Sequence, residues 1–173
     1  GQLTNAAYGF TSILLRTISD VDPERAIVAF DAPGATYRHE RFPAYKAQRP
    51  SMPDELRSQV PIVRELVAAL GLPLLEATGY EADDVIGTIA TSAARDGWEV
   101  HIVSGDLDML QLVSSKVHLL HTAKGGADAM VEYDPARIFE RYGLTPEQIV
   151  DFKALKGDSS DNIPGVPGVG EKT

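Results

Sequence analysis

The sequence predicts an α/β domain with a mostly parallel central sheet flanked by helices. Short apolar, β-rich runs at 25–30, 98–103 and 116–121 alternate with longer segments of helical spacing. Such alternation is typical of parallel strands joined by crossover helices. With 173 residues, of which 43% are hydrophobic, the chain can bury a sizeable core as one domain.

In the first half of the chain, helices are indicated by apolar spacing and by start and stop signals. Thr4 and Asn5 precede a first amphipathic helix within residues 1–17. A second helix is expected from Pro53, which suits a first helical turn, to the stop signal at Gly71.

The second half is expected to contain four more helices. The segment 80–96 carries small apolar residues on one stripe and ends at Gly97. Shorter helices are expected at 109–113, 135–142 and 146–155.

Strands and loops complete the expected order. A buried strand at 25–30 stops at Asp31, and a short strand follows at 73–76. Between them, residues 35–52 are basic and aromatic and predict a surface excursion, while 124–127 predict a glycine-rich turn.

Composition excludes several chemistries. The absence of cysteine removes disulfides, thiolate metal ligands and cysteine nucleophiles. No apolar run reaches the roughly 20 residues of a membrane helix, and no leader-like segment opens the sequence. We therefore expect no membrane partner and a cytoplasmic location.

Carboxylates gather in four short clusters beside apolar runs, and without them the net charge of −9 would be close to zero. The clusters are Asp31; Glu81, Asp83 and Asp84; Asp106 and Asp108; Asp158 and Asp161. Singly, each has a structural explanation, as a first helical turn or an Asx turn. Because parallel strands end at one edge of a sheet, we expect the clusters to meet in one crevice.

Converging carboxylates repel one another unless cations neutralise them. An all-oxygen ligand set suits the hard ions Mg²⁺ and Mn²⁺. Two such ions about 4 Å apart can stabilise the attacking and leaving oxygens of a phosphodiester. The clusters therefore predict a metal-dependent phosphodiester hydrolase.

Two further segments indicate a nucleic-acid partner. Between Arg38 and Arg49, cations alternate with aromatic rings, as on surfaces that bind a single strand. Near the end, Gly165, Gly168 and Gly170 allow backbone N–H groups to face a phosphate.

Four sequence words, in this order and spacing, closely resemble the 5′-nuclease (5′-3′ exonuclease) domain of bacterial DNA polymerase I, within the flap endonuclease superfamily. They are FDAPGATYRHERFPAYKAQR, GYEADDVIG, SGDLDMLQL and LKGDSSDNIPGVPGVGEKT. The resemblance implies a PIN-like 5′-nuclease fold and a structure-selective enzyme of DNA replication and repair. Such an enzyme removes 5′ flaps and RNA primer ends from nicked or branched DNA, using two Mg²⁺ or Mn²⁺ ions.

The resemblance also implies residue roles. The metal ligands would be Asp31, Glu81 and Asp83 on the first side, Asp106, Asp108 and Asp161 on the second, and Asp84 and Asp158 through waters. Catalytic roles would fall to Lys46, Arg49, Asp31 and Asp83. Nucleic acid would be bound by Arg38, Tyr45, Lys46, Arg49, Gly165, Gly168, Gly170 and Lys172, and the glycine hairpin is where such domains often hold K⁺.

On this reading, residues 1–155 form the catalytic core with an arch at about 33–55, and 156–173 begin a helix-hairpin-helix region. Family members carry an earlier strand with an Asp-Gly pair and further C-terminal helices, which we expect to be missing here. We therefore expect the nuclease activity of these residues to be weak or absent. We also expect a monomer that is associated with the bacterial nucleoid. Whether a polymerase domain follows is open.

Two other classes remain as alternatives. A non-catalytic binder of branched DNA would keep the basic and glycine-rich segments, but it gains nothing from the acidic clusters. A phosphatase or PIN-like ribonuclease would have acidic strand ends, but no reason for the basic segment.

Overall fold

The computed structural model describes residues 3–122 and 130–170. The expected glycine-rich turn at 124–127 and the expected DNA contact Lys172 lie outside this range. The helices are α1 (Asn5–Val21), α2 (Tyr37–Arg41), α3 (Asp54–Arg57), α4 (Val60–Ala69), α5 (Ala82–Arg95), α6 (Pro135–Tyr142) and α7 (Ile149–Lys156), with 3₁₀ turns η1 (Leu107–Leu112) and η3 (Pro146–Gln148). The strands are β1 (Val28–Ala29), β2 (Leu74–Leu75), β3 (Val100–Ser104), β4 (Val117–Thr122) and β5 (Met130–Tyr133).

The α/β class is confirmed, and two of the three strand pairs are parallel. In the described residues the strands form two small sheets, β1-β2 and β3-β4-β5, rather than one continuous sheet. Helix α5 lies against both, because it contacts β1 as well as β3. The antiparallel strand β5 was not expected, since four residues give little periodicity.

The main core lies between α5, the three-stranded sheet and the C-terminal helices. Its most buried side chains include Leu110, Leu119, Tyr133 and Ile138. Burial of such side chains is the dominant stabilising term in a domain of this size. This core fixes the ends of α5, β3 and η1, which carry the acidic clusters.

The expected helix at 53–71 is split into α3 and α4. Pro61 lacks the N–H group that a continuous helix would need at this point. At the break, Gln59 is buried and its Oε1 accepts hydrogen bonds from the N–H groups of Ala6 and Ala7. The break thereby anchors the start of α1, where N–H groups have no partner within the helix.

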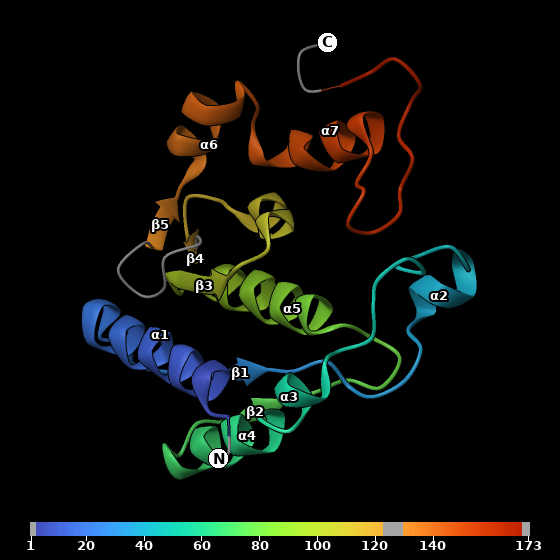
Figure 1. Cartoon of the computed structure of the whole chain (residues 1–173). Coiled ribbons are helices and arrows are strands. Elements are labelled where there is room, and N and C mark those ends of the chain that lie inside the picture. The colour runs from blue at the N-terminus through green and yellow to red at the C-terminus, as the bar shows by residue number, and fades with distance from the viewer. Residues whose placement is uncertain (1–2, 123–129, 171–173) are drawn as a thin grey trace.

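Figure 1 shows how the segment containing α2 reaches toward the segment that follows α7. We call residues 35–52 the arm and residues 157–165 the acidic loop. Gln48 Nε2 on the arm donates to the carbonyl of Ser159 at 2.8 Å, and Asn162 Nδ2 donates to the carbonyl of Ala44 at 2.7 Å. The two segments are therefore in direct contact, although more than 100 residues separate them in sequence.

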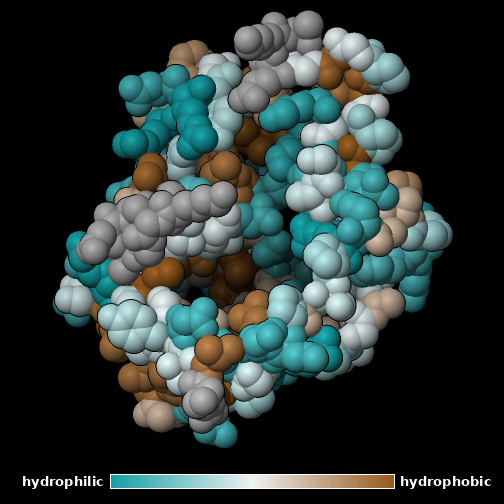
Figure 2. Space-filling model, in the orientation of Figure 1, coloured by the Kyte–Doolittle hydropathy of each residue, from teal (hydrophilic) through white to brown (hydrophobic). Residues whose placement is uncertain are grey.

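The visible face in Figure 2 is hollowed below the C-terminal segment, with mainly hydrophilic residues on the side of the arm. No helix within the described residues is long and apolar enough to cross a membrane.

Candidate active site

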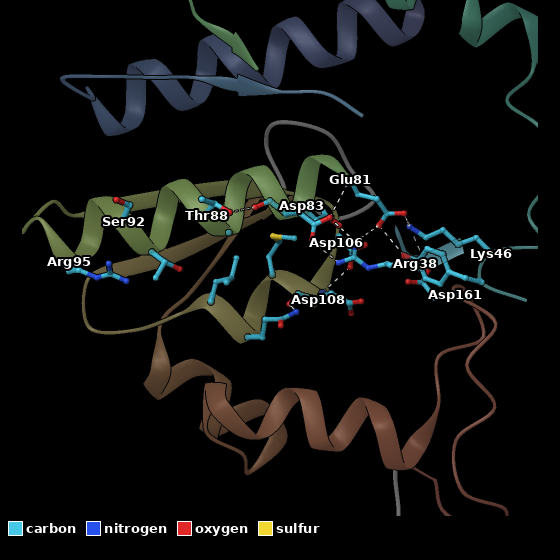
Figure 3. Close-up of a pocket in the computed structure, with 17 residues that line it drawn as sticks. Arg38, Lys46, Glu81, Asp83, Thr88, Ser92, Arg95, Asp106, Asp108 and Asp161 are labelled. Atoms are coloured by element: carbon cyan, nitrogen blue, oxygen red, sulfur yellow. Dashed lines mark hydrogen bonds and ion pairs between the residues drawn. The ribbon is translucent and has the colours of Figure 1, made fainter. Parts of the chain in front are cut away.

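A cavity of about 640 Å³ opens between α5, η1, the arm and the acidic loop. Six of the eight expected metal ligands line it: Glu81, Asp83, Asp84, Asp106, Asp108 and Asp161. Figure 3 shows several of these side chains converging at one end of α5. The expected meeting of the clusters in one crevice is thus seen for these six.

The other two candidates lie beside the cavity wall. Asp31 Oδ1 accepts the N–H of Ala82 at 2.7 Å, so it faces the start of α5. Asp158 Oδ1 accepts from the N–H and the hydroxyl of Ser160, which is the expected Asx turn.

Two acidic residues of the GYEADD word have a structural role at the start of α5. Glu81 and Asp84 form a reciprocal capping box, in which each side chain accepts from the backbone N–H of the other. Asp83 has no part in the box and lines the cavity. The capping box therefore accounts for Glu81 and Asp84, whereas Asp83 is a first-turn carboxylate that interacts favourably with the helix dipole and faces the cavity.

Asp83 is a half-buried carboxyl group that lies among other carboxylates. Burial raises its pKa to about 6, and the nearby charges of Asp106, Glu81 and Asp31 contribute in the same direction. A carboxylate among other carboxylates is disfavoured as an anion until a cation approaches. A bound positive charge would therefore favour the ionised form of Asp83.

Asp106 and Asp108 lie where β3 ends and η1 begins. Asp106 Oδ1 accepts the N–H of Asp108 at 2.8 Å and caps η1. Burial raises the pKa of Asp108, and Asp106 adds to the shift, which outweighs the favourable ion pair with Lys153. The strand end thus carries two neighbouring acidic groups.

Lys153 on α7 bridges two of the clusters, and it was not anticipated from sequence. Its Nζ lies 2.5 Å from Asp108 Oδ1 and donates to Asp158 Oδ2 at 2.6 Å. Burial opposes the charge of Asp158, but the hydrogen bonds from Lys153 and Ser160 prevail and hold its pKa well below the usual range. A lysine in the last turn of a helix normally indicates only a favourable interaction with the helix dipole, so the sequence did not mark Lys153 as part of the site.

The basic side chains of the arm are paired with acidic side chains of the cavity. Arg38 makes a bidentate pair with Asp84, at 2.6 and 2.8 Å, and this pairing lowers the pKa of Asp84. Lys46 Nζ donates to Glu81 Oε1 at 2.9 Å. Arg38 and Lys46 are therefore each held by an expected metal ligand.

The arm is also tied to the acidic loop. Arg49 Nη2 donates to Asp161 Oδ1 at 2.8 Å, and its Nε donates to the carbonyl of Ser160 at 2.9 Å. The backbone N–H of Lys46 donates to the carbonyl of Asp161 at 3.2 Å. These contacts place the arm directly over the acidic end of the cavity.

Tyr45, an expected nucleic-acid-binding residue, is buried in this structure. Tyr45 is only 6% exposed, so its ring has no face free for stacking in this conformation. Its hydroxyl donates to Glu81 Oε2 at 2.9 Å, and burial raises the pKa of the phenol. Tyr45 therefore holds Glu81 in place, a role that requires the ring to be buried.

Gly157 and Gly165 close the acidic loop through direct backbone contact. A Cβ atom on Gly165 would lie 2.5 Å from the backbone nitrogen of Gly157, and both residues have positive φ angles. Between them, Asp158 and Ile163 exchange two backbone hydrogen bonds of 2.8 Å. Gly165 is thus needed for loop closure, whereas a Cβ on Gly168 or Gly170 would meet nothing within 4 Å.

The cavity continues away from the acidic end along one exposed face of α5. This face consists of Thr88, Thr91, Ser92 and Arg95, of which three are labelled in Figure 3. Their spacing of three and four residues puts them on one stripe of the helix. The sequence analysis concentrated on the apolar stripe and missed this polar one.

Within residues 3–122 and 130–170, no three His, Asp or Glu side chains form a ready-made metal site. The pairs described above explain this, because basic side chains hold oxygens of Glu81, Asp84, Asp108, Asp158 and Asp161. The donor set is nevertheless all oxygen, which suits hard divalent ions.

Comparison with protein families assigns the class. Residues 1–143 match the family described as 5′-3′ exonuclease, N-terminal resolvase-like domain, and residues 144–173 match 5′-3′ exonuclease, C-terminal SAM fold. The chain therefore belongs to the 5′-3′ exonuclease family.

The curated relatives narrow the class to the nuclease region of DNA polymerase I, which confirms the resemblance found in the sequence. The chain is 52% identical over 173 residues to DNA polymerase I of Bacillus subtilis, and 44% identical to that of Thermus thermophilus. Each alignment covers the whole chain and 20% of the relative. The chain thus spans about a fifth of these polymerases.

Among solved structures, the 5′-exonuclease of phage T5 with bound zinc superposes with a TM-score of 0.77 at 26% identity. The alignment covers 96% of this chain and 64% of the T5 chain. Human GEN1 in complex with Holliday junction DNA has a TM-score of 0.55 at 18% identity, a level that shows a shared fold alone.

Proposed function

We propose that the chain is the metal-dependent nuclease part of a structure-selective 5′-3′ exonuclease and 5′-flap endonuclease. The observation that carries this proposal is the convergence of six candidate metal ligands with the basic arm in one cavity. Acidic groups suit the ions, and basic groups suit the phosphates of the substrate. A protein that only bound DNA would need acidic groups there only for the cap of α5 and for the ion pairs with the arm.

The residues fit a pair of hard divalent ions by ligand chemistry. Asp31, Glu81 and Asp83 would hold the first and Asp106, Asp108 and Asp161 the second, with Asp84 and Asp158 acting through waters. Mg²⁺ or Mn²⁺ would supply an activated water and stabilise the leaving oxygen. The raised pKa of Asp83 supports this choice, because like-charged neighbours make a cation favourable there.

The protein's own cations would position the scissile phosphate. Lys46 and Arg49 lie at the acidic end of the cavity, and Arg38 of α2 pairs with Asp84 in the first turn of α5. To bind phosphate, each must leave its present carboxylate partner. Exchange of partners is plausible chemistry, since both partners are anionic oxygen groups of similar geometry.

The substrate class is proposed from the arm and from the glycine hairpin, which is the segment with Gly165, Gly168 and Gly170. A 5′ flap on nicked or branched DNA, or an RNA primer end, offers a single strand for the arm and a duplex for the hairpin. A Cβ on Gly168 would meet nothing within 4 Å, which leaves space for a phosphate beside the backbone there, and K⁺ could occupy the same hairpin. The T5 neighbours support the choice, because one is a product complex with DNA and metal ions.

A second candidate is a binder of branched DNA without activity, and the lack of a ready-made metal site among the described residues favours it. Cleavage and binding of one 5′-flap duplex separate the two functions. The nuclease proposal predicts cleavage with Mn²⁺, none with a chelator, and loss of cleavage with retained binding in Asp106→Ala.

The matched control is Asp20→Ala, which removes an acidic side chain on α1 that pairs with Arg16. It should cleave like the unmodified chain. Cleavage by Asp106→Ala at the unmodified rate would remove Asp106 from the mechanism, and binding without any cleavage in Mn²⁺ would favour the second candidate.

A further inference from the structure

Lys153 lies between two acidic groups that come from different parts of the chain. Asp108 belongs to η1 after β3, and Asp158 belongs to the acidic loop. The ammonium of Lys153 reaches both, at 2.5 and 2.6 Å, from the last turns of α7. Lys153 thereby connects the acidic group of η1 with the acidic group of the acidic loop.

A single ammonium cannot satisfy two carboxylates as fully as a divalent ion. Lysine carries one charge on a flexible stem, whereas a divalent ion brings twice the charge and takes several oxygen ligands at once. The ammonium now lies on Asp108 Oδ1 and Asp158 Oδ2, the oxygens that an ion would take directly from Asp108 and through a water from Asp158. Lysine and metal would therefore compete for these two carboxylates.

Without Lys153, these carboxylates would repel each other in the metal-free protein. The side chain of Asp158 is 13% exposed and that of Asp108 is 30% exposed, so water screens their charges only in part. The lysine keeps the two groups at a separation that a cation can bridge. It thereby links η1 to α7, which contact each other in the fold.

We propose that Lys153 is a positioning residue of the metal centre: a built-in counter-cation that holds Asp108 and Asp158 together in the metal-free protein and is displaced by the divalent ion. This inference rests on the proposed metal-dependent function. Displacement would move the ammonium off the two carboxylates. It also lowers the apparent metal affinity, because the ion must first compete with a tethered cation.

Direct measurement of metal binding tests the proposal without an activity assay. Free Mn²⁺ is followed by electron paramagnetic resonance during titration of the unmodified chain, Lys153→Met, Lys153→Arg and Lys116→Met. Met keeps the length and apolar stem of lysine without its charge. Lys116 is the matched control, because its Nζ donates to the carbonyl of Gly97 instead of a carboxylate.

We expect Lys153→Met to bind Mn²⁺ about tenfold more tightly than the unmodified chain, since hydrogen bonds to charged groups contribute energies of that order. Lys153→Arg, which restores the cation, and Lys116→Met should both bind like the unmodified chain. In the metal-free state, Lys153→Met should melt at a lower temperature than the unmodified chain. Mn²⁺ should raise the melting temperature of Lys153→Met by more than it raises that of the unmodified chain.

Equal or weaker Mn²⁺ binding by Lys153→Met would overturn the inference while leaving the proposed nuclease intact. An equal gain in Lys116→Met would also overturn it, because the effect would then come from net charge. If neither the unmodified chain nor Lys153→Met binds Mn²⁺, the metal-dependent function itself fails. If Lys153→Met does not fold, Lys153→Arg and the unmodified chain must still bind equally.

Discussion

Lys46 Nζ lies 2.9 Å from Glu81 Oε1, so a side chain suited to phosphate is bonded to a side chain suited to metal. Both groups are largely shielded, with side-chain exposures of 20% and 12%. The same arrangement recurs in the pair Arg49 and Asp161. In this conformation, the arm neutralises the site that it is proposed to serve.

Replacement of Lys46 by alanine should slow flap cleavage and weaken DNA binding. One lost phosphate contact should reduce the slope of log affinity against log salt concentration by about one unit. Binding titrations over a range of salt concentrations measure this slope. The control is Lys116→Ala, which removes an equal charge from a side chain that donates to the carbonyl of Gly97, and this variant should cleave like the unmodified chain. Identical slopes in all three proteins would exclude a phosphate contact by Lys46.

Replacement of Asp83 by asparagine should stabilise the metal-free protein at neutral pH. Burial and like charges raise the pKa of Asp83 from 3.8 to about 6, so the folded state keeps a proton that the unfolded state releases between those values. The free energy of unfolding contributed by this group therefore falls as the pH rises through that window and stays lower above it.

After allowance for screening by solvent, we expect Asp83→Asn to gain about 1 kcal/mol at pH 7 and almost nothing below pH 4. Urea unfolding with a chelator present, at a series of pH values, provides the measurement. A variant that is less stable than the unmodified chain at pH 7 would show that the charge of Asp83 is already compensated.

The bidentate pair of Arg38 and Asp84 should couple the arm to α5. A double-mutant cycle with Arg38→Ala and Asp84→Asn should give an interaction energy of about 1.5 kcal/mol, because the pair is charge-assisted and partly buried. Since the pKa of Asp84 is lowered in the folded state, this contribution is present above the ordinary carboxyl pKa and lost as the pH falls. Additive single-variant effects at pH 7 would mean that the pair is not coupled in solution.

Replacement of Gly165 by alanine should destabilise the chain by about 3 kcal/mol, from overpacking and from a positive φ angle. Gly168→Ala also has a positive φ angle but meets nothing within 4 Å, so it should cost only about 1 kcal/mol. Thermal melting compares the two variants. If Gly168→Ala instead shows the larger loss of stability, the backbone contact of Gly157 with Gly165 is not what closes the acidic loop.

The position of the acidic clusters could be predicted from sequence because it follows from where strands and helices end. Asp106 follows β3 and Asp83 lies in the first turn of α5, and both positions are set by local patterns. The apolar stripe of α5 was equally predictable. Local signals therefore gave the class of fold and the acidic half of the site.

Contacts between distant segments could not be predicted in this way. Nothing local to Lys153 distinguishes it from an ordinary lysine near a helix end, and its partners lie on two other segments. Burial of Tyr45 depends in the same way on packing of the arm over the cavity. The break before α4 combined a local signal, Pro61, with a distant one, the anchoring of α1 by Gln59.

Calorimetric titration of the unmodified chain with Mg²⁺ and Mn²⁺, paired with thermal melting, tests the central claim most directly. The account predicts heat of binding and a higher melting temperature with either ion, both reduced in Asp83→Asn. Absence of heat and an unchanged melting temperature with both ions would contradict the claim that these carboxylates form a metal centre.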